Sequence, residues 1–508
     1  MTSSISTLNK NKQRALIFQG GGALGAYEAG IFKALHDDFF EKDGNDNRAL
    51  FDIVAGTSAG AINAVLLVNY VIQRGTWEGS ADILMNFWKD VSTSTWYFEN
   101  PFMEYWQDTA HFFRDQSNRM WQQFFEPVDE IYDKAREKWP LLPFYYYWPD
   151  KYGPLATAEV SRRYRSWFQF SQSPLGTPNV LSPAILQPDF RFFNPLNTLL
   201  RYDNSPMTEM ILRHWKNKED KAEPIKTTEG QPRLLIVAVD VQDATTVTFD
   251  SYPKEDGHLM SVYGDEDKVK HEIYYDKGIE MKHLLTTMSS HVRHKFPELN
   301  VKSTFPNDRT TVEDLRPFMD GFYLSNTPLR EVLQAHRDYY DKVIKKGKDV
   351  PSLDIIIGDL YPTFQNGTPL DPDSINNRVQ DVLFHDKSKY DEKSAILVSD
   401  YIGISKVLWN YVENKDKNAA DQLKMEINKI IRSKDRKGDP RKFDDLINGR
   451  FTIDNLVRIE YGSNQHVNES DDISGKAFEF SAHTIKYLIE AGKRDTFKYK
   501  DGWKDWLI

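Results

Sequence analysis

The stretch Phe51–Ala64 constrains the fold of this chain more than any other. Its first five residues, FDIVA, form a short apolar run with the length and composition of a buried strand. The pentapeptide GTSAG follows at 56–60, and the residues after it are small and apolar, as in a buried helix. The sequence therefore predicts a strand, a sharp turn and a helix, with Ser58 at the apex of the turn.

This arrangement is typical of the G-x-S-x-G nucleophile elbow. Gly56 and Gly60 suit it because the turn is too tight for a side chain at either position, and Thr57 and Ala59 complete the motif. An elbow would hold Ser58 in strained backbone geometry with its Oγ exposed. The amides at the start of the following helix would favour developing negative charge. The alternative is an ordinary strand-to-helix turn in which the serine only caps the helix.

A second glycine-rich turn lies one strand earlier, after the candidate strand Arg14–Phe18. Its spacing fits the G-x-G-x-x-G dinucleotide fingerprint, which needs an acid ending a second strand about 20 residues later. The acids of residues 36–48 lie instead in a polar loop. Bare amides at a helix start also form an oxyanion hole, and we favour this interpretation over glycines that serve packing alone. The candidate oxyanion-hole residues are Gly20, Gly21, Gly22, Ala23, Leu24 and Gly25.

With Asp320-Gly321-Phe322 and the SNTP segment at 325–328, these two turns resemble the patatin-like phospholipase family, whose motifs occur in the same order. The resemblance covers roughly residues 14–360. It implies a Ser–Asp dyad, with Ser58 as nucleophile, Asp320 as base and the amides of the glycine loop as the oxyanion hole. Two positions depart from the family pattern. Leu24 stands where Lys or Arg is usual, and Phe322 stands where Gly or Ala is usual.

A serine hydroxyl needs a base to become a good nucleophile. None of the 12 histidines lies in a context that marks it as a partner of Ser58. Asp320, expected in a Gly-containing turn after the polar segment 303–317, could serve if desolvation raises its pKa; its alternative role is an Asx turn that only stabilises the loop. Together with the resemblance, which implies the lipid substrate, the sequence predicts a serine acyl hydrolase that cleaves fatty-acyl esters of phospholipids or lysophospholipids, without metal or cofactor. The alternatives are an acyltransferase with the same acyl-enzyme, and a non-catalytic lipid- or dinucleotide-binding protein.

Composition narrows the class of protein further. The net charge of −10 argues against a nucleic-acid binder, and the absence of cysteine excludes disulfides, zinc–thiolate sites and a cysteine nucleophile. The sequence contains no apolar run of about 18 residues, so we expect no membrane-spanning helix. The polar N-terminus lacks the apolar core of a secretory signal. We expect a cytoplasmic protein with a lipid substrate, and any contact that it makes with a membrane is expected to be peripheral. The oligomeric state stays open.

Buried strands that alternate with helices predict a mainly parallel α/β sheet, and the resemblance implies a three-layer α/β/α domain. Leu234–Val241 and Leu353–Leu360 are the strongest buried-strand candidates. An aromatic-rich helical insertion either packs on the core or forms an acyl-chain groove or interfacial surface. The expected boundaries are a flexible tail at 1–13, the acyl hydrolase domain at 14–366 with the insertion at 80–206, and a helical C-terminal extension at 367–508.

Overall fold

The computed structural model describes the chain in several stretches. They are residues 12–40, 50–92, 180, 182–183, 202–217, 219–265, 268–289, 296–305, 310–340, 350–364, 372–385, 388–433, 441–443, 446, 451–462, 477 and 479–499. Most of the aromatic-rich insertion expected at 80–206 lies outside these residues, and so does nearly all of the tail expected at 1–13.

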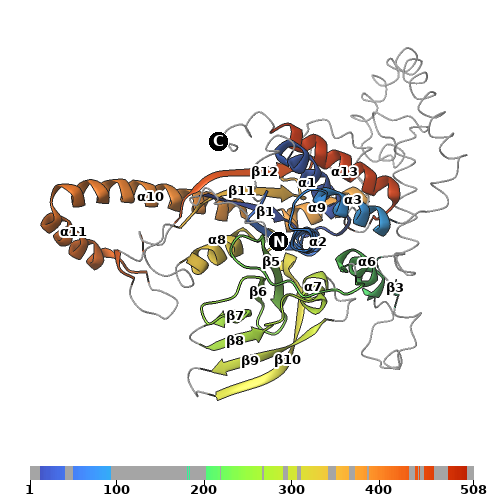
Figure 1. Ribbon diagram of the computed structural model, residues 1–508, viewed down its shortest axis with the longest axis horizontal. Coiled ribbons are helices and arrows are strands. Elements are labelled where there is room, and N and C mark those ends of the chain that lie inside the picture. The colour runs from blue at the N-terminus through green and yellow to red at the C-terminus, as the bar shows by residue number, and fades with distance from the viewer. Residues whose placement is uncertain are drawn as a thin grey trace, which may run out of the picture.

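The described residues form a ten-stranded mixed sheet (Figure 1). Five neighbouring strands run parallel, in the order β12-β11-β1-β2-β5. Beyond β5 the pairing becomes antiparallel, with β6 and the series β10-β9-β8-β7. The parallel strands are β12 (Ile453–Glu460), β11 (Ser352–Asp359), β1 (Lys12–Phe18), β2 (Ile53–Thr57) and β5 (Arg233–Asp240). The antiparallel strands are β6 (Thr245–Asp250), β7 (Met260–Asp265), β8 (Val269–Tyr274), β9 (Glu298–Phe305) and β10 (Thr310–Asp320).

Helices cover both faces of the parallel strands, so the expected three-layer α/β/α architecture is confirmed. On one face, apolar residues of β1, β2 and β5 share a core with five longer helices and with Leu284 of α7 (Met281–Met288). On the other face, Leu329 and Val332 of α8 pack against Ile17 and Ile355. The helices of the first face are α1 (Gly25–Phe40), α2 (Ala59–Arg74), α3 (Ser80–Val91), α6 (Ser205–Trp215) and α13 (Ala482–Phe497), and α8 spans Leu329–Asp338.

The C-terminal region is helical, as expected, and contributes to the main body. Strand β12 lies at the edge of the parallel sheet, and α13 packs closely on α1. A Cβ atom on Gly30 of α1 would lie 2.1 Å from the carbonyl oxygen of Ile489 in α13, so only glycine permits this approach. Helix α9 (Pro372–Phe384) lies near the sheet, whereas α10 (Ser388–Lys415) and α11 (Lys417–Ile430) project away from it (Figure 1). Among the described helices, none combines the length and apolar character that crossing a membrane requires.

The elements that hold the predicted motifs occur where the sequence placed them, with one difference. Strands β1 and β2 precede the glycine loop and the elbow, and helices follow both. The polar segment 303–317, however, belongs largely to strands β9 and β10. Asp320 is therefore the last residue of a strand, and the turn after it is the 3-10 helix Gly321–Tyr323.

Candidate active site

The elbow has the geometry that its sequence predicts. Ser58 connects β2 to α2 with φ 54° and ψ −122°, a strained conformation for a residue with a side chain. A Cβ atom on Gly56 would lie 2.2 Å from the carbonyl oxygen of Gly60, and one on Gly60 would lie 2.6 Å from the carbonyl oxygen of Gln19. Neither glycine could carry a side chain without moving the backbone.

Two contacts from distant elements hold the elbow in place. The backbone N–H of Ser58 donates to Thr287 Oγ1 at 2.8 Å, and Thr287 belongs to α7 (Met281–Met288). The hydroxyl of Thr57 donates to the backbone carbonyl of Ser325 at 2.9 Å. The strained turn is thus supported from two sides, which keeps the Ser58 side chain in one orientation.

Asp320 is completely buried at the end of β10, where it pairs with Ala238 of β5. Its Oδ1 accepts the backbone N–H of Phe322 at 3.1 Å, and its Oδ2 has no hydrogen-bond partner of ordinary geometry among the described residues. Burial raises the pKa of Asp320 to about 7. The Ser58 side chain lies within hydrogen-bonding reach of this carboxyl group and, with the Phe322 amide, counters part of that rise.

The glycine loop lies against both residues. A Cβ atom on Gly20 would lie 3.0 Å from Ser58 Cβ, 3.3 Å from Phe322 Cβ and 2.8 Å from Asn326 Oδ1. Gly20 is therefore the point at which the glycine loop, the elbow and the residues after Asp320 meet.

Most amides of the glycine loop already have hydrogen-bond acceptors. Gly20 donates to Asn326 Oδ1 at 3.0 Å, Ala23 to the carbonyl of Ala477 at 2.9 Å, and Leu24 to the carbonyl of Gly21 at 3.1 Å. The Gly25 amide donates to the carbonyls of Ala23 and Gly22. Among the described residues, the amides of Gly21 and Gly22 have no acceptor, and Gly22 adopts a left-handed φ of 57°.

A buried hydrogen-bond network supports the loop from behind. The Gln19 backbone N–H donates to Glu28 Oε1 at 2.5 Å, and Asn63 Nδ2 donates to Glu28 Oε2 at 3.1 Å. Burial raises the pKa of Glu28 well above its usual value. The Gln19 side chain donates to Thr327 Oγ1 at 2.6 Å and accepts the Leu360 amide at 2.7 Å. The end of β1 is thereby fixed to α1, to β11 and to the segment after Asp320.

Both departures from the family pattern have a clear structural setting. Leu24 is completely buried and belongs to the main apolar core, so the usual cation has been replaced by a packed side chain. The Phe322 ring packs on Tyr323 and Phe384, with ring centroids 4.0 and 4.7 Å apart. Phe322 thus extends the aspartate turn into an aromatic cluster while Asp320 keeps its place beside Ser58.

A Ser–His–Asp arrangement separate from the Ser58 site occurs in the antiparallel part of the sheet. His271 contacts Ser303 Oγ at 2.8 Å and Asp243 Oδ2 at 2.5 Å. Ser303 and His271 are cross-strand partners, both are buried, and Arg316 also binds Asp243 at 3.0 Å. We interpret this group as a structural network. Among the residues that the structure describes, no three His, Asp or Glu side chains gather as metal ligands would.

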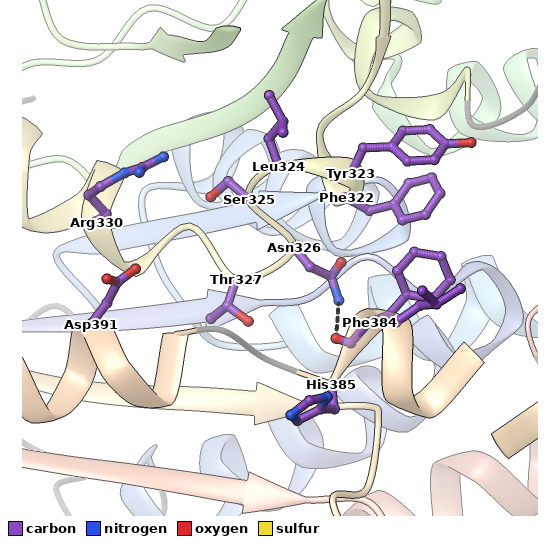
Figure 2. A pocket seen from close by; sticks show the side chains of 11 residues that line it. Phe322, Tyr323, Leu324, Ser325, Asn326, Thr327, Arg330, Phe384, His385 and Asp391 are labelled. Carbon is purple, nitrogen blue, oxygen red and sulfur yellow. Dashed lines mark hydrogen bonds between the residues drawn. The ribbon is translucent and has the colours of Figure 1, made fainter. Parts of the chain in front are cut away.

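A pocket lies on the outer side of the aspartate turn (Figure 2). The space between its lining residues is about 500 Å³ when the part open to solvent is included. Phe322 and Asn326 form part of its wall, and Arg330, His385 and Asp391 supply its ionisable side chains. Because Asn326 also accepts the Gly20 amide, the pocket and the Ser58 site share a wall.

Residues 16–211 match the family model of the patatin-like phospholipases. The resemblance is thus confirmed for the part of the chain that holds the glycine loop and the elbow. A comparison with curated proteins gives no match. Among solved structures, VipD from Legionella pneumophila aligns over 96% of this chain and 67% of its own, with 10% identity and a TM-score of 0.26.

The patatin-like motifs include the sequence-predicted site residues, and the structure brings most of them together. Ser58, Asp320, Gly20 and Phe322 meet at one point, whereas Leu24 faces the core. The sequence analysis missed Thr287, Gln19 and Glu28. Thr287 lies in an ordinary helical pattern and carries no signal. A polar residue directly before the glycines and an acid in the following apolar helix could have pointed to Gln19 and Glu28.

Proposed function

We propose that this protein is a serine acyl hydrolase that cleaves fatty-acyl esters of phospholipids or lysophospholipids through Ser58 and Asp320. One observation supports this most directly. A buried carboxyl group with a pKa near 7 lies within hydrogen-bonding reach of a serine on a strained elbow. A base whose pKa is close to the working pH is efficient at removing a proton. The family match supports the lipid ester as substrate class.

In the first half-reaction Asp320 accepts the proton of Ser58 Oγ as this oxygen attacks the ester carbonyl carbon. The tetrahedral intermediate collapses, the ester C–O bond breaks, and the leaving alcohol takes the proton from Asp320. In the second half-reaction Asp320 removes a proton from water, which attacks the acyl-serine. Collapse releases the fatty acid and returns the proton to Ser58.

The negative charge that develops on the carbonyl oxygen needs fixed donors. We assign this role to the amides of Gly21 and Gly22, which have no acceptor among the described residues. The amides of Gly20, Ala23, Leu24 and Gly25 are occupied by protein acceptors, so they shape the loop. This assignment is narrower than the whole glycine loop that the sequence suggested.

The test is ester hydrolysis by the wild type and by Ser58→Ala, with p-nitrophenyl butyrate and with lysophosphatidylcholine. The matched control is Ser92→Ala at the end of α3, whose hydroxyl only donates to the carbonyl of Lys89. We expect Ser58→Ala to lose hydrolysis of both substrates and Ser92→Ala to keep it. Hydrolysis by a folded Ser58→Ala protein would contradict the proposal. Product formed only after an alcohol or lysolipid acceptor is added would indicate acyl transfer instead.

A further inference from the structure

Helix α9 buries polar side chains and exposes apolar ones, the reverse of an ordinary surface helix. Asn377 and Asp381, one turn apart, are only 2% and 4% exposed and face the protein body. Apolar side chains recur on the outer side at helical spacing with exposures of 47–62%. We call them the α9 face; they are Ile375, Val379, Val382 and Leu383. Burial of polar groups costs free energy, and apolar groups that stay exposed contribute no stabilisation from burial. This arrangement therefore fits a helix whose outer side has an apolar partner.

The α9 face adjoins the proposed active site. The last residue of α9, Phe384, packs its ring on Phe322, and its carbonyl accepts Asn326 Nδ2 at 3.4 Å. Leu383 lines the pocket of Figure 2 together with Tyr323 and Leu324, which are 41% and 47% exposed. Exposed apolar side chains therefore continue from α9 to the turn that begins at Asp320.

We propose that the α9 face docks on a lipid surface made of zwitterionic phospholipids. This inference rests on the proposed function and names the partner of the same site. The continuity with the aspartate turn favours a lipid surface, because whatever covers the α9 face also adjoins the turn that begins at Asp320. The lipid layer that covers the α9 face would then also contain the substrate.

The pocket lining agrees with this partner. Arg330 and His385 can contact a phosphate group, and Asp391 can contact an ammonium group. Arg330 also pairs with Glu331 at 3.0 Å, but its side chain is 58% exposed and can reach outward. The aromatic rings of Phe322, Tyr323 and Phe384 provide the surface that a quaternary ammonium group prefers. A headgroup with both charges matches this lining better than a purely anionic one.

Co-sedimentation with phosphatidylcholine vesicles tests the proposal. The protein carries Ser58→Ala, so that the vesicles stay intact. In this background, Val379→Glu with Val382→Glu should reduce the bound-to-free ratio by about tenfold or more, because two apolar side chains no longer enter the interface. The matched control is Val312→Glu with Leu315→Glu, on equally exposed positions of β10, and it should bind as the parent does. Val379→Ser with Val382→Ser, which adds no charge, should show an intermediate loss, and circular dichroism checks that each variant is folded.

Equal binding by the α9 and β10 variants would overturn the proposal, and so would a parent protein that binds no vesicles. Light scattering, which measures the oligomeric state, tests whether a second copy of the protein covers the α9 face instead. A parent protein that dimerises through the α9 face, and becomes monomeric in the α9 variant without vesicle binding, would show that a second copy covers it. Hydrolysis of soluble p-nitrophenyl butyrate by the wild type reports on the proposed function separately, since that substrate needs no lipid surface.

Discussion

The side-chain oxygen of Asn326 accepts the backbone N–H of Gly20 at 3.0 Å. The amide nitrogen of the same side chain donates to the Phe384 carbonyl at 3.4 Å. Asn326 thus connects the glycine loop, the segment after Asp320 and the end of α9. Gly21 and Gly22, the proposed oxyanion donors, follow Gly20 directly, so their position depends on this contact.

Asn326→Ala should therefore reduce kcat by about 10- to 100-fold with little change in KM, because it loosens the glycine loop without removing a reacting group. The loss of the buried hydrogen bond should also reduce the free energy of unfolding by about 1 kcal/mol. Steady-state kinetics on p-nitrophenyl butyrate and urea denaturation measure the two effects. Unchanged kcat in a folded variant would show that Asn326 does not position the loop.

Gly20→Ala should reduce ester hydrolysis by about 100-fold or more. Its Cβ would lie 2.8 Å from Asn326 Oδ1 and 3.0 Å from Ser58 Cβ, so the loop or the elbow must move. The matched control is Gly403→Ala in α10, where a Cβ atom would meet nothing within 4 Å. Similar activity in the two variants would contradict the close approach of the glycine loop to Ser58.

The sequence was sufficient for the elements whose information is local. The elbow at Ser58 needs two flanking glycines, an apolar strand and an apolar helix, and all of these lie within a few residues. The fold class followed from the alternation of buried strands and helices. Strands β9 and β10 were missed because their exposed positions carry charged residues, and only pairing with β5 and β8 makes them strands.

The supporting contacts of the site could not be predicted, because they join residues far apart in the chain. Thr287 lies in an ordinary helical pattern, and nothing in that pattern marks it as the acceptor for the Ser58 amide. Gln19 and Thr327 are 308 positions apart, yet their side chains are 2.6 Å apart. Only the tertiary fold, in which β2 and β5 lie between β1 and β10, brings these groups together.

Hydrolysis should depend on pH through Asp320. The base acts only when it is ionised, and burial raises the pKa of Asp320 to about 7. The kcat/KM for p-nitrophenyl butyrate should therefore rise about tenfold per pH unit below pH 7 and level off above it. Measurement between pH 5 and 9, with Ser58→Ala as the blank, checks this. A profile that is flat from pH 5 upward would mean that the base has an ordinary carboxyl pKa.

Asp320→Asn should be inactive and yet more stable than the wild type at high pH. The unfolded chain ionises Asp320 near pH 3.8, whereas the folded protein does so near pH 7, so the wild type loses stability as the pH rises between these values. The advantage of Asp320→Asn should be small near pH 4 and reach at most about 4 kcal/mol above pH 7. Urea denaturation of both proteins at pH 4.5 and pH 8 measures it. A pH-independent difference would show that Asp320 is not a desolvated carboxyl group.

The central claim is that Ser58 is an activated nucleophile whose base is Asp320. Labelling with a serine-reactive fluorophosphonate tests it most directly, with the wild type beside Ser58→Ala and Asp320→Asn at pH 8. We predict that the wild type is labelled, that Ser58→Ala is not, and that Asp320→Asn is labelled at least about 100-fold more slowly. Labelling of Ser58→Ala, or equal rates in the wild type and Asp320→Asn, would contradict this account of the site.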